Sequence, residues 1–208
     1  PQPDIIEHFG NADAVPQPLK RCLSRQAGIV RCCPIYFVCP AHRERGAAMA
    51  ELLQTTLCYL EQNGCYLMLH RIKKKNDVNH DKWIGVGGKF APGETAEACA
   101  LREVWEETGL TMQSPAYRGI VDFTCEPWPA ERMHLYTCTD FTGTLTDCNE
   151  GTLEWVPKPE VEDLPIWQGD KIFLRLLAEG APFFHLELTY HGDTLVQAVL
   201  EGETLPCG

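Results

Sequence analysis

The sequence predicts an α/β (α+β) sandwich in which a mixed sheet is flanked by few helices. Three observations support this fold class. Two segments near the ends of the regularly patterned region are typical of β-hairpins, and a segment between them carries the start and stop signals of a helix. Strands mixed with few helices favour stacked layers of sheet and helix around a common core.

The first hairpin is predicted from two apolar, β-prone runs, residues 53–60 and 65–72, on either side of Asn63-Gly64. Asn-Gly favours a two-residue hairpin turn, because both positions of that turn require positive φ. The polar and basic residues 71–80 then predict a loop, and residues 83–86 predict another short strand.

The main helix is predicted from Thr95, a suitable N-cap, to about Thr108, where Gly109 provides a C-terminal stop. The remaining pattern predicts further strands, a second helix and a closing hairpin that turns at Gly192-Asp193. In chain order these are strands at 117–124, 133–141 and 152–156, a helix at 169–179 and hairpin strands at 183–190 and 194–200.

The chain has 208 residues and a net charge of -11, with an isoelectric point near 5.1. This length suits one well-buried domain with a tail. An acidic surface disfavours general nucleic-acid binding, which needs basic side chains to displace counterions. Neither a membrane-spanning run nor a signal peptide is evident, so we expect a cytoplasmic protein without a membrane or stable nucleic-acid partner, as a monomer or homodimer.

Residues 1–48 differ from the rest, because they hold six of the fifteen prolines, four of the eleven cysteines and few periodic apolar positions. We expect an N-terminal extension that is irregular or not native, with Met49 as the natural start and a domain over 49–208. A genuine but poorly ordered extension is the alternative. A zinc knuckle formed by Cys32, Cys33, Cys39 and His42 is a further alternative to the unpaired thiols that we favour.

A cluster of carboxylates is the feature that carries chemistry. Glu103, Glu106 and Glu107 fall at helical positions i, i+3 and i+4 and therefore share one face of the predicted helix. Such a cluster needs a cation to offset its repulsion, and oxygen ligands suit the hard cations Mg²⁺ and Mn²⁺. A solvated acidic face is the alternative. Leu101, Val104 and Trp105 are expected to anchor the opposite face in the core.

The whole segment 88–110 resembles the signature of the Nudix hydrolases, G-x5-E-x7-R-E-U-x-E-E-x-G-U, in which U is aliphatic. All nine defined positions match, namely Gly88, Glu94, Arg102, Glu103, Val104, Glu106, Glu107, Gly109 and Leu110. The resemblance implies an α/β/α sandwich with a loop–helix–loop metal site.

By this resemblance, Glu103, Glu106 and Glu107 hold the metal together with the Gly88 carbonyl. Arg102 orients a carboxylate of this cluster, and Glu94 sets the loop from behind the ligands. The metal neutralises the diphosphate and acidifies the attacking water, with Glu106 or Glu107 as the base.

The resemblance extends over residues 52–201, whose end is similar to MutT-type hydrolases of oxidised purine nucleoside triphosphates. Trp167 matches an aromatic residue that frames the purine there, and Asp170 matches the second acid of a closely spaced pair, whereas Gly169 stands where the first acid would be. Ile84, after Trp83, replaces an asparagine. The alternatives are a core position for Trp167 and a helix-start role for Asp170.

Trp83 and Lys89 complete the predicted substrate site, with Lys89 as a phosphate contact. The function expected is hydrolysis of a purine nucleoside triphosphate, oxidised (8-oxo-dGTP) or not, to the monophosphate and pyrophosphate. One alternative is a pyrophosphatase of nucleoside diphosphate sugars or ADP-ribose, and another is a nucleotide sensor without catalysis. The intact set of glutamates disfavours the sensor.

Overall fold

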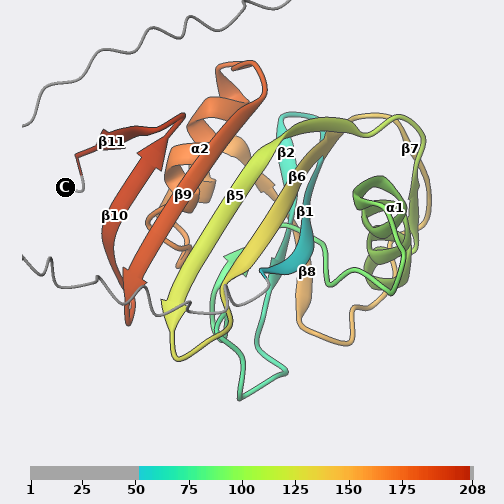
Figure 1. Cartoon of the computed structure of the whole chain (residues 1–208). Helices are drawn as coiled ribbons and strands as arrows, with labels where there is room; N and C mark the ends of the chain where they lie inside the picture. The colour runs from blue at the N-terminus through green and yellow to red at the C-terminus, as the bar shows by residue number, and fades with distance from the viewer. Residues whose placement is uncertain (1–51, 207–208) are drawn as a thin grey trace, which may run out of the picture. The chain divides into compact units, whose positions relative to one another are not determined.

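The computed structural model describes residues 52–206, and within that range nine strands form one mixed sheet (Figure 1). The expected extension 1–48, with the zinc knuckle considered there, lies outside the described residues. The sheet order is β11-β10-β9-β5-β6-β1-β2-β3, and β8 pairs with β2 beside this path. The strands are β1 (Leu53–Gln62), β2 (Cys65–His70), β3 (Trp83–Ile84), β5 (Ala116–Glu126), β6 (Glu131–Cys138), β8 (Thr152–Pro157), β9 (Phe184–His191), β10 (Thr194–Leu200) and β11 (Glu203–Leu205).

Two of the strand pairs, β1 with β6 and β5 with β9, are parallel, whereas the other pairs in the sheet are antiparallel. The mixed sheet that the sequence predicts is therefore present. A separate two-stranded sheet joins β4 (Leu110–Met112) to β7 (Phe141–Gly143), and a 3₁₀ helix covers Lys158–Asp163.

The central strand β1 shows how the layers are built, because its successive side chains enter two different cores. Cys58 packs with Val104 of α1 (Ala96–Thr108) in one core. Leu57 and Tyr59 pack with Phe173 of α2 (Asp170–Ala178) in the other. Since neighbouring strand residues point to opposite faces, the two helices cover opposite faces of the sheet. This is the expected α/β/α sandwich.

The predictions of the first hairpin turn and of the two ends of α1 are confirmed. Asn63 and Gly64 adopt positive φ of 50° and 77° at the turn between β1 and β2. The side chain of Thr95 caps α1 by accepting a hydrogen bond from the backbone N–H of Ala98. Gly109 ends the helix at φ 74°, and its N–H donates to the Trp105 carbonyl. Both ends of this helix are thus determined locally.

Two expectations were wrong in detail. The strand predicted at 133–141 ends at Cys138, and Phe141 begins β7, which pairs with β4 instead. Trp105, expected in the core, is 60% exposed, whereas Val104 is fully buried. The buried face of α1 is formed by Cys99, Ala100, Val104, Glu107 and Thr108, so the next residue after Val104 turns toward solvent.

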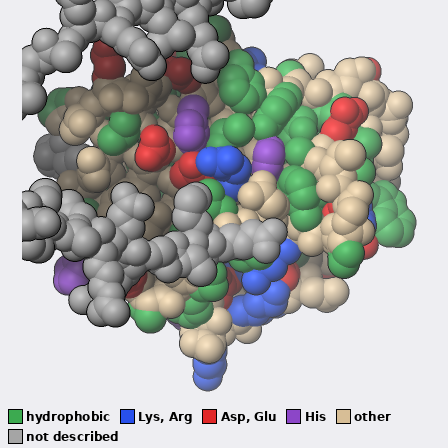
Figure 2. Space-filling view, viewed as in Figure 1, with side chains coloured by type: hydrophobic (Ala, Val, Ile, Leu, Met, Phe, Trp, Pro, Cys, Tyr) green, Lys and Arg blue, Asp and Glu red, His purple; other side chains and the backbone are tan. Residues whose placement is uncertain are grey.

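The sheet face opposite α2 is mixed in character over β5, β6 and β9. Figure 2 shows basic, acidic and imidazole side chains among hydrophobic ones on this face. Asp122 accepts two hydrogen bonds from Arg132, each of 2.7 Å, and lies 2.9 Å from Nε2 of His185. Tyr117 and Phe183 are exposed aromatic residues on the adjoining surface.

No helix within residues 52–206 has the length and the apolar character needed to cross a membrane.

The orientation of α1 gives a stability prediction. Val104→Ala is expected to lower the free energy of unfolding by about 2 kcal/mol, because it removes buried methyl groups and leaves a cavity. Trp105→Ala removes a larger but exposed side chain and is expected to cost less than about 0.5 kcal/mol. Urea unfolding of both variants measures the difference, and a larger loss for Trp105→Ala would contradict the orientation.

Candidate active site

The loop before α1 packs directly on β1, where β2 has diverged from that strand. The N–H of Thr56 donates to the Gly88 carbonyl over 2.8 Å, and the N–H of Phe90 donates to Gln54. A Cβ on Gly87 would lie 2.1 Å from the Thr56 carbonyl oxygen, so no side chain fits there. Gly87 therefore permits a contact that brings this loop against the sheet.

The same loop makes room for two glutamates of α1. A Cβ on Gly88 would lie 2.4 to 2.6 Å from atoms of the Glu103 carboxylate. The Glu107 carboxylate accepts a 3.1 Å hydrogen bond from the Gly87 N–H and is 8% exposed. Both carboxylates consequently lie beside the backbone of the glycine pair.

Arg102 ties the acidic residues of the helix to the preceding loop. Its Nε and Nη2 donate to the two carboxylate oxygens of Glu94 over 2.9 and 2.8 Å, a bidentate pair. Its Nη1 donates to Glu103 over 2.7 Å and to Glu106 over 3.2 Å. Glu94 also accepts from the Ala91 N–H, and the Arg102 guanidinium lowers the pKa of Glu94 to about 2. Arg102 was expected to orient a carboxylate of the helix cluster; its bidentate pair is made with Glu94 instead, and it contacts Glu103 and Glu106 through Nη1 alone.

The surroundings of Glu107 fit a hard divalent cation. Burial, together with the charges of Glu150 and Glu103, raises the pKa of Glu107 to about 8 against the lowering effect of the Gly87 hydrogen bond. A nearby cation would favour the charged carboxylate. Within 52–206, no three Asp, Glu, His or Cys side chains enclose a metal by themselves. The Gly88 carbonyl, water or substrate oxygens would therefore complete an oxygen-ligand shell around Glu103 and Glu107.

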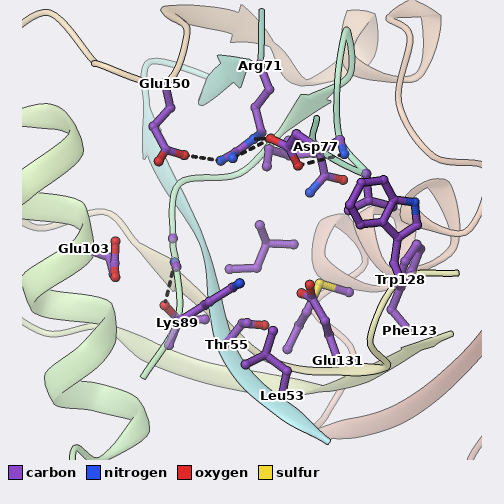
Figure 3. Close-up of a pocket in the computed structure, with 18 of the residues that line it drawn as sticks. Leu53, Thr55, Arg71, Asp77, Lys89, Glu103, Phe123, Trp128, Glu131 and Glu150 are labelled. Atoms are coloured by element: carbon purple, nitrogen blue, oxygen red, sulfur yellow. Dashed lines mark hydrogen bonds and ion pairs between the residues drawn. The ribbon is translucent and has the colours of Figure 1, made fainter. Parts of the chain in front are cut away.

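A cavity of about 550 Å³ joins this acidic end to an aromatic end. Figure 3 shows Glu103 on one side and Phe123 and Trp128 on the other, with Lys89 and Thr55 between them. The volume lies in the range of small-molecule sites, which is about 300 to 1,000 Å³. One ligand can therefore contact the helix carboxylates and the aromatic residues together.

Trp167 belongs to both the core and the cavity. It is only 4% exposed, and its ring makes edge contacts with Phe123 and Tyr190 at centroid distances of 5.3 and 4.8 Å. One part of the ring lines the cavity, and the indole N–H donates to Oδ1 of Asn79 over 2.8 Å. The two alternatives considered for this residue are thus compatible.

Asp170 lines the same end and is 5% exposed. Burial raises its pKa to about 8, against the lowering effect of Lys82. Its neighbour Gly169 has no room for a side chain, because a Cβ there would lie 2.5 Å from Leu188 and 2.7 Å from the Tyr190 hydroxyl. The acid that the sequence lacks at 169 therefore could not be added without displacing core residues.

Ion pairs line another side of the cavity. Arg71 is paired with Asp77 and Glu150 over 2.6 and 2.5 Å, and Lys74 is paired with Glu150 as well (Figure 3). Glu131, whose pKa is raised by burial, also faces the cavity. None of these residues was predicted to belong to the site. Arg71, Lys74 and Asp77 lie in the charged loop predicted at 71–80, whereas no sequence signal pointed to Glu131 or Glu150.

The sequence model of the NUDIX domain family matches residues 53–177, which include the loop, α1 and most of α2. The chain belongs to the Nudix family. Members of this family are hydrolases that act on nucleoside diphosphate linkages and generally use divalent metal ions. The segment at 88–110 is thus the Nudix segment of this chain, and its loop and helix border the cavity.

Relatives of the Nudix family resemble this chain over most of its described length. The uncharacterized Nudix hydrolase YvcI of Bacillus subtilis is 26% identical over 150 residues, which cover 68% of this chain and 89% of YvcI. An oxidized purine nucleoside triphosphate hydrolase of Mus musculus is 29% identical over 111 residues, which cover 53% of this chain and 71% of that protein. The crystal structure of a MutT protein from Bacillus halodurans has a TM-score of 0.64 and 28% identity, and the match covers 73% of this chain and 99% of that one.

The structure gathers six of the ten predicted site residues around the cavity and leaves four outside its lining. Glu106 has a half-exposed side chain, and Arg102 and Glu94 pair with one another behind the loop. Trp83 stacks on His70 at a centroid distance of 4.7 Å, away from the cavity. The residues gathered are Gly88, Lys89, Glu103, Glu107, Trp167 and Asp170.

The raised pKa of Asp170 gives a prediction on pH. Between about pH 4 and 8 the folded protein keeps the Asp170 proton that the unfolded chain has lost, so this residue makes the free energy of unfolding fall as pH rises. Asp170→Asn is expected to remove that contribution, which has a slope of at most about 1.4 kcal/mol per pH unit. Urea unfolding of the variant and the wild type across this range measures it.

Asp163→Asn is the matched control, because Asp163 is an exposed aspartate near the same helix. The stability of Asp170→Asn relative to the wild type should increase with pH, whereas that of Asp163→Asn should stay nearly constant. A constant difference for Asp170→Asn would contradict its burial as a protonated acid.

Proposed function

We propose that this Nudix protein hydrolyses a purine nucleoside triphosphate, oxidised or not, to the monophosphate and pyrophosphate. The observation that carries this proposal is one continuous cavity that has carboxylates at one end and aromatic residues at the other. A purine can occupy the Trp167 end while the phosphates reach Glu103 and Glu107. The matches to a MutT protein and to the mouse hydrolase of oxidized purine nucleoside triphosphates support this assignment.

Glu103, Glu107 and the Gly88 carbonyl are the proposed holders of Mg²⁺ or Mn²⁺ on the cavity side. Glu106 lies on the same helix and shares Arg102 with Glu103, so it can join from the solvent side. When bound, the divalent cation supplies positive charge against the diphosphate and acidifies water. Arg102 holds Glu103 in place, because the Arg102 guanidinium is itself anchored by its two hydrogen bonds to Glu94.

Lys89 is the proposed contact for the phosphates. It follows the glycine pair directly and lies between the carboxylate end and Thr55 in the cavity (Figure 3). An ammonium group there can neutralise phosphate charge that the metal leaves uncovered. Glu107 or Glu150 can accept the proton of the attacking water, since both carboxylates line the same cavity.

A panel of nucleotides tests the function. We expect turnover of dGTP, 8-oxo-dGTP or dATP with Mg²⁺ or Mn²⁺, and pyrophosphate as the product released. Release of inorganic phosphate alone would place the cut at a different bond. Turnover of ADP-ribose with none of the triphosphates would favour the alternative linkage, and no turnover of any nucleotide would contradict the enzyme assignment.

A glutamine scan tests the proposed metal ligands. Glu107→Gln is expected to reduce kcat by about a hundredfold or more, because the amide cannot offer a charged oxygen to the cation. The amide oxygen can still accept the Gly87 hydrogen bond, so the melting temperature should change little. Glu103→Gln is expected to act similarly.

Glu97→Gln is the control, because Glu97 is an exposed glutamate in the first turn of the same helix. It should keep kcat within about twofold of the wild type. Titration of Mn²⁺ into each variant separates lost metal binding from lost chemistry. Full turnover by Glu107→Gln would show that the assignment of this ligand is wrong.

A further inference from the structure

Trp167 fixes the orientation of the Asn79 side chain. An indole N–H is only a donor, so the amide atom 2.8 Å from it must be the oxygen Oδ1. The amino group Nδ2 then carries the two remaining N–H donors. No partner for it is seen among residues 52–206, and the Asn79 side chain lines the cavity. A ligand in the cavity would therefore face a hydrogen-bond donor at Asn79.

The backbone around Asn79 is also held in place. Its N–H donates to the Asp77 carboxylate over 3.1 Å, and its carbonyl accepts from the Lys82 N–H over 3.0 Å. Asp77 is in turn fixed by Arg71, whose Nε donates to it over 2.7 Å. A donor held by these contacts loses little conformational freedom when a ligand binds.

The cavity wall near Trp167 is formed largely by apolar side chains. Ile84 lines the cavity and offers no polar group there. Asp170 also lines the cavity, and at neutral pH it is largely the neutral acid because burial raises its pKa to about 8. The carboxylates of Asp77 and Glu131 line the cavity as well, but Asp77 is already paired with Arg71. The apolar residues that complete this end are Leu57, Val78, Phe123, Trp128 and Met133.

We propose that Asn79 donates a hydrogen bond to the nucleobase and makes the cavity prefer bases that present a carbonyl oxygen over bases that present an amino group. The inference rests on the proposed function, because it places the base at the Trp167 end. An amino group facing Nδ2 would bring donor against donor and leave both without an acceptor in a desolvated site. Buried donors without partners carry a large penalty, which is the origin of the preference.

Asn79→Asp is the sharpest test of this role. The aspartate keeps an oxygen for the Trp167 N–H and replaces the second donor by an acceptor of the same size. Asn76→Asp is the matched control, because Asn76 lies in the same loop, lines the same cavity and has no hydrogen bond to Trp167. Both variants add the same charge.

The measurement is kcat/KM for dITP and dATP, which carry a carbonyl and an amino group at the same ring position. The wild type should prefer dITP by about tenfold or more. Asn79→Asp should lower the dITP-to-dATP ratio by about tenfold to a hundredfold, and Asn76→Asp should keep it within about twofold. An unchanged ratio in Asn79→Asp, or equal shifts in both variants, would overturn the proposal.

Asn79→Ala serves if the aspartate variant does not fold. It removes the donor, so its dITP-to-dATP ratio should approach one, and a retained preference for dITP would overturn the proposal.

Binding of the products dIMP and dAMP separates this inference from the proposed function. Quenching of tryptophan fluorescence reports this binding without turnover or metal. If no nucleotide is hydrolysed but Asn79→Asp still reverses the preference for dIMP, the function fails and the role of Asn79 stands. If nucleotides are hydrolysed with no change of preference, the function stands and the role of Asn79 fails. If neither turnover nor selective binding is seen, both fail.

Discussion

The contact of the Gly87-Gly88 backbone with β1 on one side and α1 on the other is the constraint on which the site depends. A Cβ on Gly87 would meet the Thr56 backbone carbonyl, and a Cβ on Gly88 would displace the Glu103 carboxylate. The hydrogen bond from the Gly87 N–H to Glu107 joins loop and helix. The sheet thus sets the position of the helix carboxylates through a few backbone atoms.

This arrangement destabilises the charged form of Glu107, and a bound cation can offset that destabilisation. Glu107 is buried near Glu103 and Glu150, and Arg102 neutralises Glu103 from behind but does not pair with Glu107. A folded chain without a cation therefore keeps an acidic group in a place that disfavours its charge. A local conflict of this kind is expected at a functional site, where the rest of the fold has to hold it. Here the two hydrophobic cores on either face of β1 do so.

The sequence was most informative where contacts are local. The limits of α1 followed from Thr95 and Gly109, since capping involves neighbours only a few residues away. Trp105 was wrongly expected in the core. Helical spacing shows which residues share a face of α1, but it does not show at which residue the buried face ends. Glu150 and Asn79 could not be predicted as neighbours of α1 and Trp167. Their contacts span from about 40 to 90 positions along the chain and depend on how the loops cross the sheet.

The structure explains the two positions, Gly169 and Ile84, at which the chain departs from the MutT-type pattern. Gly169 is required by the packing of Leu188 and Tyr190, and the Gly169 N–H donates to the Tyr190 hydroxyl over 2.6 Å. Ile84 lies in the core that includes Trp167. The polar contact missing at these two positions can then come from a different segment, the loop that carries Asn79. The carboxylates of α1 and the side chains proposed to surround the base belong to separate parts of the chain, so under the proposed function the base preference could change while the glutamates stay in place.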